Sequence, residues 1–190
     1  DVCSSDLATG GNVTLTTVTS GDATVAGNGT ATSGAITLTA SGANGTLTLD
    51  DALTGVASVG ATGSATSGAI TLLADGDVTV NASLETGTAD TVDGDATSGL
   101  VSVTSSNGSV AMSAATVMTG DATVTGNGTA TSGAITLTAE RNVDSDALST
   151  GVASAAEGDA TSGAIDVVAT SGNVTLTTVT SGNEIGRAHV

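Results

Sequence analysis

Hydrophobic and polar residues alternate along short stretches of the chain, which are separated by pairs containing glycine. In Ile36-Thr37-Leu38-Thr39 the apolar residues are two positions apart, so they share one face of an extended strand and the threonines share the other. These stretches are rich in β-branched residues, which favours strands. No stretch has the apolar period of an amphipathic helix. The pattern therefore predicts an all-β protein.

The same strand-like pattern recurs at nearly constant intervals. The phrase Ala-Thr-Ser-Gly-Ala-Ile-Thr-Leu occurs at 31–38, 65–72 and 130–137, with variants at 96–103 and 160–167. Its glycine recurs at spacings of 34, 31, 34 and 30 residues, at Gly34, Gly68, Gly99, Gly133 and Gly163. A second phrase, such as Val78-Thr79-Val80, and a third, less regular segment, such as Ala122-Thr123-Val124, complete each unit. The chain is thus predicted to consist of three-strand repeats.

A repeat of this kind has to stack on its neighbours. A unit of 30–34 residues with three short strands cannot bury its apolar face alone, but stacking in register buries Ile over Ile and Leu over Leu. The Asn-Gly, Asp-Gly and Ser-Gly pairs between phrases are expected to form turns that require positive φ. The sequence therefore predicts a parallel β-helix of about five rungs, separated by about 4.8 Å.

The two ends of the chain do not follow the repeat. Residues 11–21 are identical to 172–182, and beyond one mismatch (Gly10 against Ser171) Ala8-Thr9 match Ala169-Thr170, but nothing before residue 8 aligns. The heptapeptides 1–7 and 184–190 can be encoded by reverse-complementary DNA, GACGTGTGCTCTTCCGATCTC and GAGATCGGAAGAGCACACGTC, and they resemble a translated sequencing adapter. We therefore expect 1–7 and 184–190 to be foreign sequence and 8–183 to be a fragment of a repeat solenoid.

Composition narrows the possible chemistry. The chain has 27 glycines and no aromatic residue, proline or lysine, and its apolar content of Ala, Val, Leu and Ile suits a thin core. Cys3, His189 and Arg187 all lie in the terminal heptapeptides. Residues 8–183 therefore contain no thiol or imidazole to act as base or nucleophile, and Arg141 is their only basic residue. We expect no enzyme activity and no cofactor.

The net charge of −17 excludes further classes of partner. Nucleic-acid binding needs clustered Lys and Arg, and anionic membrane surfaces repel an acidic protein. No apolar run approaches the roughly 18 residues of a membrane-spanning helix. We expect no nucleic-acid partner and no membrane insertion of this segment.

The recurring Ser-Gly-Ala-Ile-Thr-Leu-Thr-Ala and Ser-Gly-Asn-Val-Thr-Leu-Thr phrases, which cover essentially all of 8–183, resemble the repetitive passenger regions of filamentous-haemagglutinin-like and autotransporter adhesins. That resemblance implies a right-handed parallel β-helix, exported to the bacterial cell surface or secreted. It also implies a structural or adhesive stalk whose host-cell or neighbouring-cell receptor is bound outside this segment.

Two kinds of ligand site are alternatives to a plain stalk. Gly-Asp-Ala-Thr phrases place carboxylates at Asp22, Asp95, Asp121 and Asp159, and with Asp75, Asp77 and Asp93 they suggest calcium binding. The weak calcium candidates are Asp75, Asp77, Asp93 and Asp95, but a hydroxyl separates the stacked Asp95 and Asp159, so solvated turns are the preferred interpretation of these residues. Thr-x-Thr pairs resemble the ladders of ice-binding β-helices, at Thr14/Thr16, Thr37/Thr39, Thr46/Thr48, Thr136/Thr138 and Thr175/Thr177.

Two further motifs have simpler explanations. Asn-x-Ser/Thr triplets that could accept glycans begin at Asn12, Asn28, Asn44, Asn81, Asn107, Asn127 and Asn173, but Asn-rich turns and duplication account for them. The carboxylate pairs Asp50/Asp51 and Asp144/Asp146 could in principle act as in glycosidases, but no Arg, Lys or aromatic platform accompanies them.

Overall fold

The computed structural model describes residues 4–9 and 11–186, which form β-strands and contain no helix. The strands are paired in parallel and make three sheets. Each repeat adds one strand to each sheet, except that the first repeat adds two short strands to the third sheet. Sheet A consists of β1 (Ser4–Thr9), β5 (Ile36–Ser41), β8 (Ile70–Ala74), β11 (Val101–Ser105), β14 (Ile135–Ala139) and β17 (Ile165–Ala169).

The other two sheets follow the same order along the axis. Sheet B consists of β2 (Val13–Thr19), β6 (Leu47–Leu53), β9 (Val78–Glu85), β12 (Val110–Met118), β15 (Val143–Ser149) and β18 (Val174–Thr180). Sheet C consists of β3 (Ala23–Val25), β4 (Gly29–Thr32), β7 (Ala57–Thr66), β10 (Ala89–Thr97), β13 (Ala122–Thr131), β16 (Ala153–Thr161) and β19 (Glu184–Ile185).

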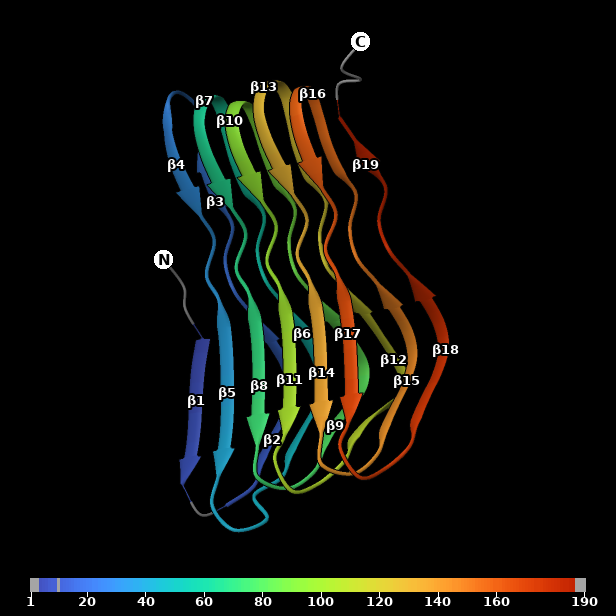
Figure 1. The fold of residues 1–190 in the computed structure, drawn as a ribbon. Coiled ribbons are helices and arrows are strands. Elements are labelled where there is room, and N and C mark those ends of the chain that lie inside the picture. The colour runs from blue at the N-terminus through green and yellow to red at the C-terminus, as the bar shows by residue number, and fades with distance from the viewer. Residues whose placement is uncertain (1–3, 10, 187–190) are drawn as a thin grey trace.

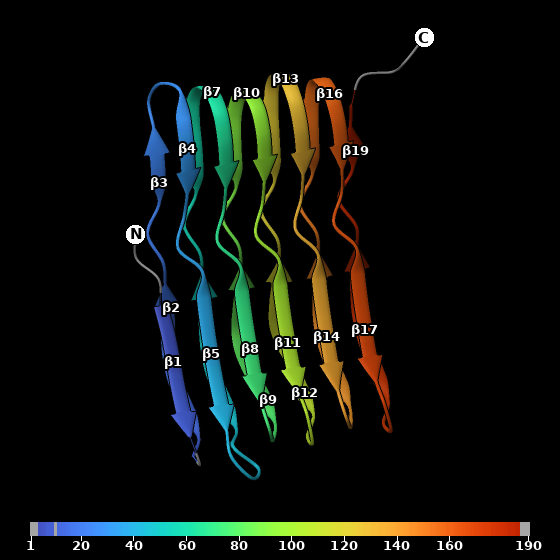
Figure 2. The same cartoon turned by 60° about the vertical axis from the view of Figure 1, so that its left-hand side comes forward.

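The chain coils through the sheets in the order A, B, C and returns to sheet A one rung further along (Figure 1). In Figure 1 the strands of sheet A descend on the near side and those of sheet B ascend behind them, while the chain advances from left to right, so the coil is right-handed. Figure 2 shows that the rungs remain side by side along the whole stack. The predicted parallel β-helix of about five rungs is confirmed.

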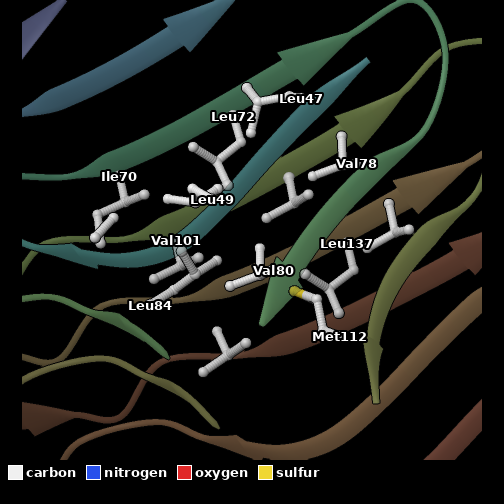
Figure 3. Close-up of a cluster of buried hydrophobic side chains, with 14 of the residues drawn as sticks. Leu47, Leu49, Ile70, Leu72, Val78, Val80, Leu84, Val101, Met112 and Leu137 are labelled. Carbon is white, nitrogen blue, oxygen red and sulfur yellow. The ribbon is translucent and has the colours of Figure 1, made fainter. Parts of the chain in front are cut away.

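The main core lies between sheets A and B and consists of aliphatic columns. Within a strand every second residue points inward, as in Ile36, Leu38 and Ala40 of β5, all of which are fully buried. Stacking in register turns these positions into columns, for example Ile36, Ile70, Val101, Ile135 and Ile165. In Figure 3, Ile70, Leu72, Val101 and Leu137 of sheet A lie against side chains of sheet B, including Leu47, Leu49 and Met112.

Sheet C forms a second, thinner core by folding on itself. In β7 the chain ascends with Ala57 and Val59 pointing inward, turns, and descends with Ala65 pointing inward. The corresponding positions in other rungs are mostly alanine, and they form a cluster separate from the main core. Small side chains are required because two arms of the same strand face each other. The predicted third, irregular segment is thus a two-armed strand.

Between the strands of sheet A and those of sheet C the ribbon narrows to a waist (Figure 2). Glycines line this waist, which separates the two cores. A Cβ added to Gly68, Gly99 or Gly133 would lie 1.9 Å from the carbonyl oxygen of the glycine one rung earlier. None of these three has φ in the left-handed region, which among the described glycines is confined to Gly29, Gly42, Gly94 and Gly128. The expected positive φ is present in Asn28-Gly29, Ser41-Gly42, Asp93-Gly94 and Asn127-Gly128. At the Ser-Gly pairs of the waist that expectation is wrong. Glycine is needed there because neighbouring backbones are in close contact.

Buried hydroxyl groups connect the two sides of the waist and adjacent rungs. Ser33 Oγ donates to Gly55 O at 2.6 Å and accepts from Gly68 N at 2.8 Å. Thr54 Oγ1 donates to Gly68 O at 2.8 Å and accepts from Gly87 N at 3.0 Å. Serine and threonine repeat this arrangement in later rungs, so the buried polar groups of the waist are satisfied along the stack.

The terminal heptapeptides lie partly inside and partly outside the described residues. Residues 1–3 and 187–190, which include Cys3 and His189, are outside them. In β1, Ser4 is in register with Ile36 and Asp6 with Leu38, whereas Ala8 is in register with Ala40. The register thus shows the same departure from the repeat before residue 8 that the alignment shows, and the foreign origin of the heptapeptides remains a prediction.

Candidate functional site

The four calcium candidates fall into two separate places of the same rung. Asp75 and Asp77 lie in the turn between β8 and β9, where sheet A passes into sheet B. Asp93 and Asp95 lie within β10 of sheet C, at and just after its bend. Neither pair is joined by a third carboxylate. Among residues 4–9 and 11–186, no group of three or more acidic, His or Cys side chains is placed to hold a metal ion.

The carboxylates of these aspartates accept hydrogen bonds from neighbouring rungs. Asp75 Oδ2 accepts from Asn44 N at 2.7 Å and Asp75 Oδ1 from Asn107 Nδ2 at 2.6 Å, so this side chain links three rungs. Asp77 Oδ1 accepts from Ser109 N at 2.8 Å. These contacts give the corner aspartates a structural role as caps for exposed backbone N–H groups.

The sheet C aspartates are bonded in the same way. Asp93 Oδ1 accepts from Asn127 N at 2.9 Å and Asp95 Oδ1 from Thr129 N at 3.3 Å. Asp95 and Asp159 are in register with Thr30, Ser64 and Thr129, on the outer face of the descending arm. They therefore lie on strands rather than in turns. Asp22 and Asp121, from the same Gly-Asp-Ala-Thr phrase, lie instead just before the ascending arm.

The Thr-x-Thr pairs are divided between two sheets. On sheet A the first outward column consists of Thr37, Thr71, Ser102, Thr136 and Asp166, and the second of Thr39, Leu73, Thr104, Thr138 and Val168. Hydroxyl side chains thus fill seven of the eight positions on four successive rungs, interrupted by Leu73. On sheet B the column of Thr14 and Thr48 is interrupted by Ala111 and Asp144. Sheet A presents the more regular hydroxyl face.

The remaining candidate residues lie on the surface. All seven Asn residues of the Asn-x-Ser/Thr triplets are exposed. In the carboxylate pair on β6, Asp50 Oδ1 accepts from Asn81 Nδ2 and Asp51 Oδ1 from Ser83 Oγ, both at 2.9 Å. These bonds again link successive rungs and leave the pair on an open sheet surface instead of in a cleft.

The waist produces a feature that the sequence reasoning missed. Where sheet B passes into sheet C, the outer surface is hollowed by a groove of about 410 Å³ that extends over four successive rungs. We call it the waist groove; its wall side chains include Asp22, Leu53, Val56, Glu85, Met118 and Asp121. A signal was present in the sequence, because Leu53 and Met118 each precede a Thr-Gly pair and break the polar pattern of the surface.

Comparison of the chain with protein-family models, with curated proteins and with solved structures finds no match. Within the described part of the chain, no helix has the length and apolar character needed to cross a membrane.

Proposed function

We propose that the chain is a structural or adhesive stalk segment of a secreted or surface-anchored bacterial adhesin. The observation that carries this proposal is the continuity of the stack. Each rung pairs with the next through all three sheets, and the waist hydroxyls add hydrogen bonds between rungs. Such a stack transmits force along its axis through many parallel hydrogen bonds, which is what a spacer between a cell and a distal binding region requires.

The surface chemistry supports the same proposal. The net charge of −17 keeps copies of the stack apart and soluble. The outer faces carry mostly Thr, Ser and Asp, and the carboxylates described above bond to neighbouring rungs. A host-cell or neighbouring-cell receptor would then be bound by another part of the adhesin. No catalytic activity is proposed for this segment.

Localisation is the most direct test of this function. The complete reading frame containing 8–183 would be expressed in a Gram-negative host, and antibodies against the present chain would be applied to intact and to permeabilised cells. The proposal expects labelling of intact cells, and a secretion-signal or barrel domain in the same reading frame. Labelling that appears only after permeabilisation would overturn it.

A ligand-binding β-solenoid is the second candidate, and the hydroxyl face of sheet A is the observation that favours it. Thr37, Thr39, Thr136 and Thr138 lie on one sheet, with rungs about 4.8 Å apart. A regular array of hydroxyls is the kind of surface that could order water as ice does. Thermal hysteresis measured by nanolitre osmometry tests this candidate, with Thr71→Asp as the variant expected to abolish it. No hysteresis at millimolar protein would reject it.

A further inference from the structure

The waist groove carries apolar side chains that the fold itself does not require. Leu53, Val56 and Met118 are 44%, 38% and 39% exposed. Leu53, Glu85 and Met118 follow one another in one register column, in which the next rungs have Ser149 and Thr180. Because the same position of the rung is occupied by a polar residue elsewhere in the stack, folding does not require Leu53 and Met118 to be apolar. Exposed apolar side chains gathered in a groove indicate a contact surface.

The same groove is acidic. Asp22, Glu85 and Asp121 lie along it, and its lining contains no basic side chain. Asp22 Oδ1 accepts from Val56 N at 2.8 Å, and Asp121 Oδ1 accepts from Val152 N at 2.7 Å. These bonds hold the two carboxylates in place before any ligand arrives, which reduces the ordering cost of binding. A ligand complementary to this groove is therefore cationic at its ends and apolar between them.

The spacing of the carboxylates matches an extended peptide. Asp22, Val56, Thr88 and Asp121 each directly precede one member of a single register column, formed by Ala23, Ala57, Ala89 and Ala122. Three rung steps therefore separate Asp22 from Asp121. Three steps of about 4.8 Å span about 14 Å. In an extended strand, residues i and i+4 point to the same side and lie about 13–14 Å apart. Residue i+2 points the same way, over the middle of the groove, where Leu53 and Val56 share one rung and Glu85 lies between Leu53 and Met118.

We propose that the waist groove binds an extended peptide segment with basic residues at i and i+4 and an apolar residue at i+2. The basic side chains pair with Asp22 and Asp121, and Glu85 adds negative charge between them. The apolar side chain contacts Leu53, Val56 and Met118. This site would give the segment a binding function of its own, and it stands whether or not the segment serves as a stalk.

Fluorescence anisotropy with a labelled Lys-Thr-Leu-Thr-Lys peptide tests the proposal on the full chain. An isomer with adjacent lysines, Leu-Thr-Lys-Lys-Thr, has the same charge and composition but the wrong spacing. We expect Glu85→Gln to weaken binding of the first peptide about threefold to fivefold. Met118→Thr should weaken it about fivefold or more, because the buried apolar contact is lost.

Two matched controls separate the groove from general attraction to an acidic protein. Asp144→Asn removes the same charge from the surface of sheet B, and Leu73→Thr removes an exposed leucine from sheet A. Both should leave the dissociation constant within about twofold. Circular dichroism melts confirm that every variant is folded. Equal binding of the two peptides, equal weakening by Glu85→Gln and Asp144→Asn, or no binding at millimolar peptide would each overturn the proposal.

Discussion

Single residues at the waist determine how closely successive rungs approach. The glycines there stack backbone on backbone, and the hydroxyl beside each glycine takes up the N–H of the next rung, as Ser67 does for Gly99 at 2.7 Å. The Ser-Gly and Thr-Gly pairs therefore form a unit: the glycine allows the contact and the hydroxyl satisfies the polar groups that it buries.

Replacing a waist glycine by alanine tests this close contact. In Gly99→Ala the new Cβ would lie 1.9 Å from Gly68 O, so the rungs must separate. We expect a loss of about 1–3 kcal/mol or more in the free energy of unfolding, as for other overpacked sites. Gly27→Ala is the matched control, because nothing lies within 4 Å of its Cβ position. Urea unfolding of both variants measures the difference, and equal midpoints would contradict the role of the glycine columns.

The hydroxyl network can be tested without changing side-chain volume. Thr86 Oγ1 donates to Gly99 O at 2.8 Å and accepts from Gly120 N at 3.0 Å. Thr86→Val leaves Gly99 O, which is buried, and Gly120 N, which is partly buried, without this partner, which should cost about 1–3 kcal/mol of unfolding free energy. Thr66→Val, on the exposed outer face of sheet C, should cost much less. If both variants unfold at the same urea concentration, the network does not stabilise the waist.

Ser145 has a buried hydroxyl that, unlike those of the waist, forms no hydrogen bond among the described residues. Its column contains Leu49, Val80, Met112 and Leu176. Ser145→Ala removes this unsatisfied hydroxyl, so we expect unchanged or higher stability, by up to about 1–2 kcal/mol. A clear loss of stability in calorimetry would show that the hydroxyl has a partner.

At the scale of elements, all three strands of the repeat were predicted, but the bend and second arm of the third were not. Ile36-Thr37-Leu38-Thr39 alternates strictly, so its place in sheet A followed from periodicity. The arms of sheet C are filled by alanine, as at Ala57 and Ala65, and alanine gives little periodic signal. The phrase Gly-Asp-Ala-Thr also occurs at two places in the rung, before the ascending arm at Asp22 and on the descending arm at Asp95. Local sequence alone does not distinguish them.

The corner aspartates lead to a prediction about calcium. Asp75 already bonds to Asn44 and Asn107, and the described residues contain no group of carboxylates that could complete a site. We therefore expect the same melting midpoint in millimolar calcium and in a chelator. Calcium would raise the midpoint only if it bound the folded state in preference to the unfolded state. A midpoint that rises by several degrees with calcium would contradict this and would favour the calcium-binding alternative.

The groove was missed because it belongs to no single repeat. Its acidic and apolar side chains come from four rungs, and Leu53 and Met118 meet there because their separation corresponds to two rung steps. An alignment of the repeats compares these positions one column at a time. In the folded stack, the residues that differ between repeats lie side by side on one surface. Departures from the repeat at exposed positions are therefore the signal to follow in this chain.

At the scale of the whole molecule, stability comes from neighbours rather than from any one rung. Each rung buries its aliphatic columns on the next, so the stack behaves as a one-dimensional array. Under a pulling force along its axis, such an array should unfold one rung, or a few rungs, at a time. This mechanical property is the central requirement of a stalk.

Single-molecule force spectroscopy, with the chain held at its two ends, measures that property directly. A rung of 30–34 residues releases about 100–120 Å of extended chain when it unfolds. The stalk account predicts force peaks separated by this length or by whole-number multiples of it. Smooth extension at low force, without peaks, would contradict it.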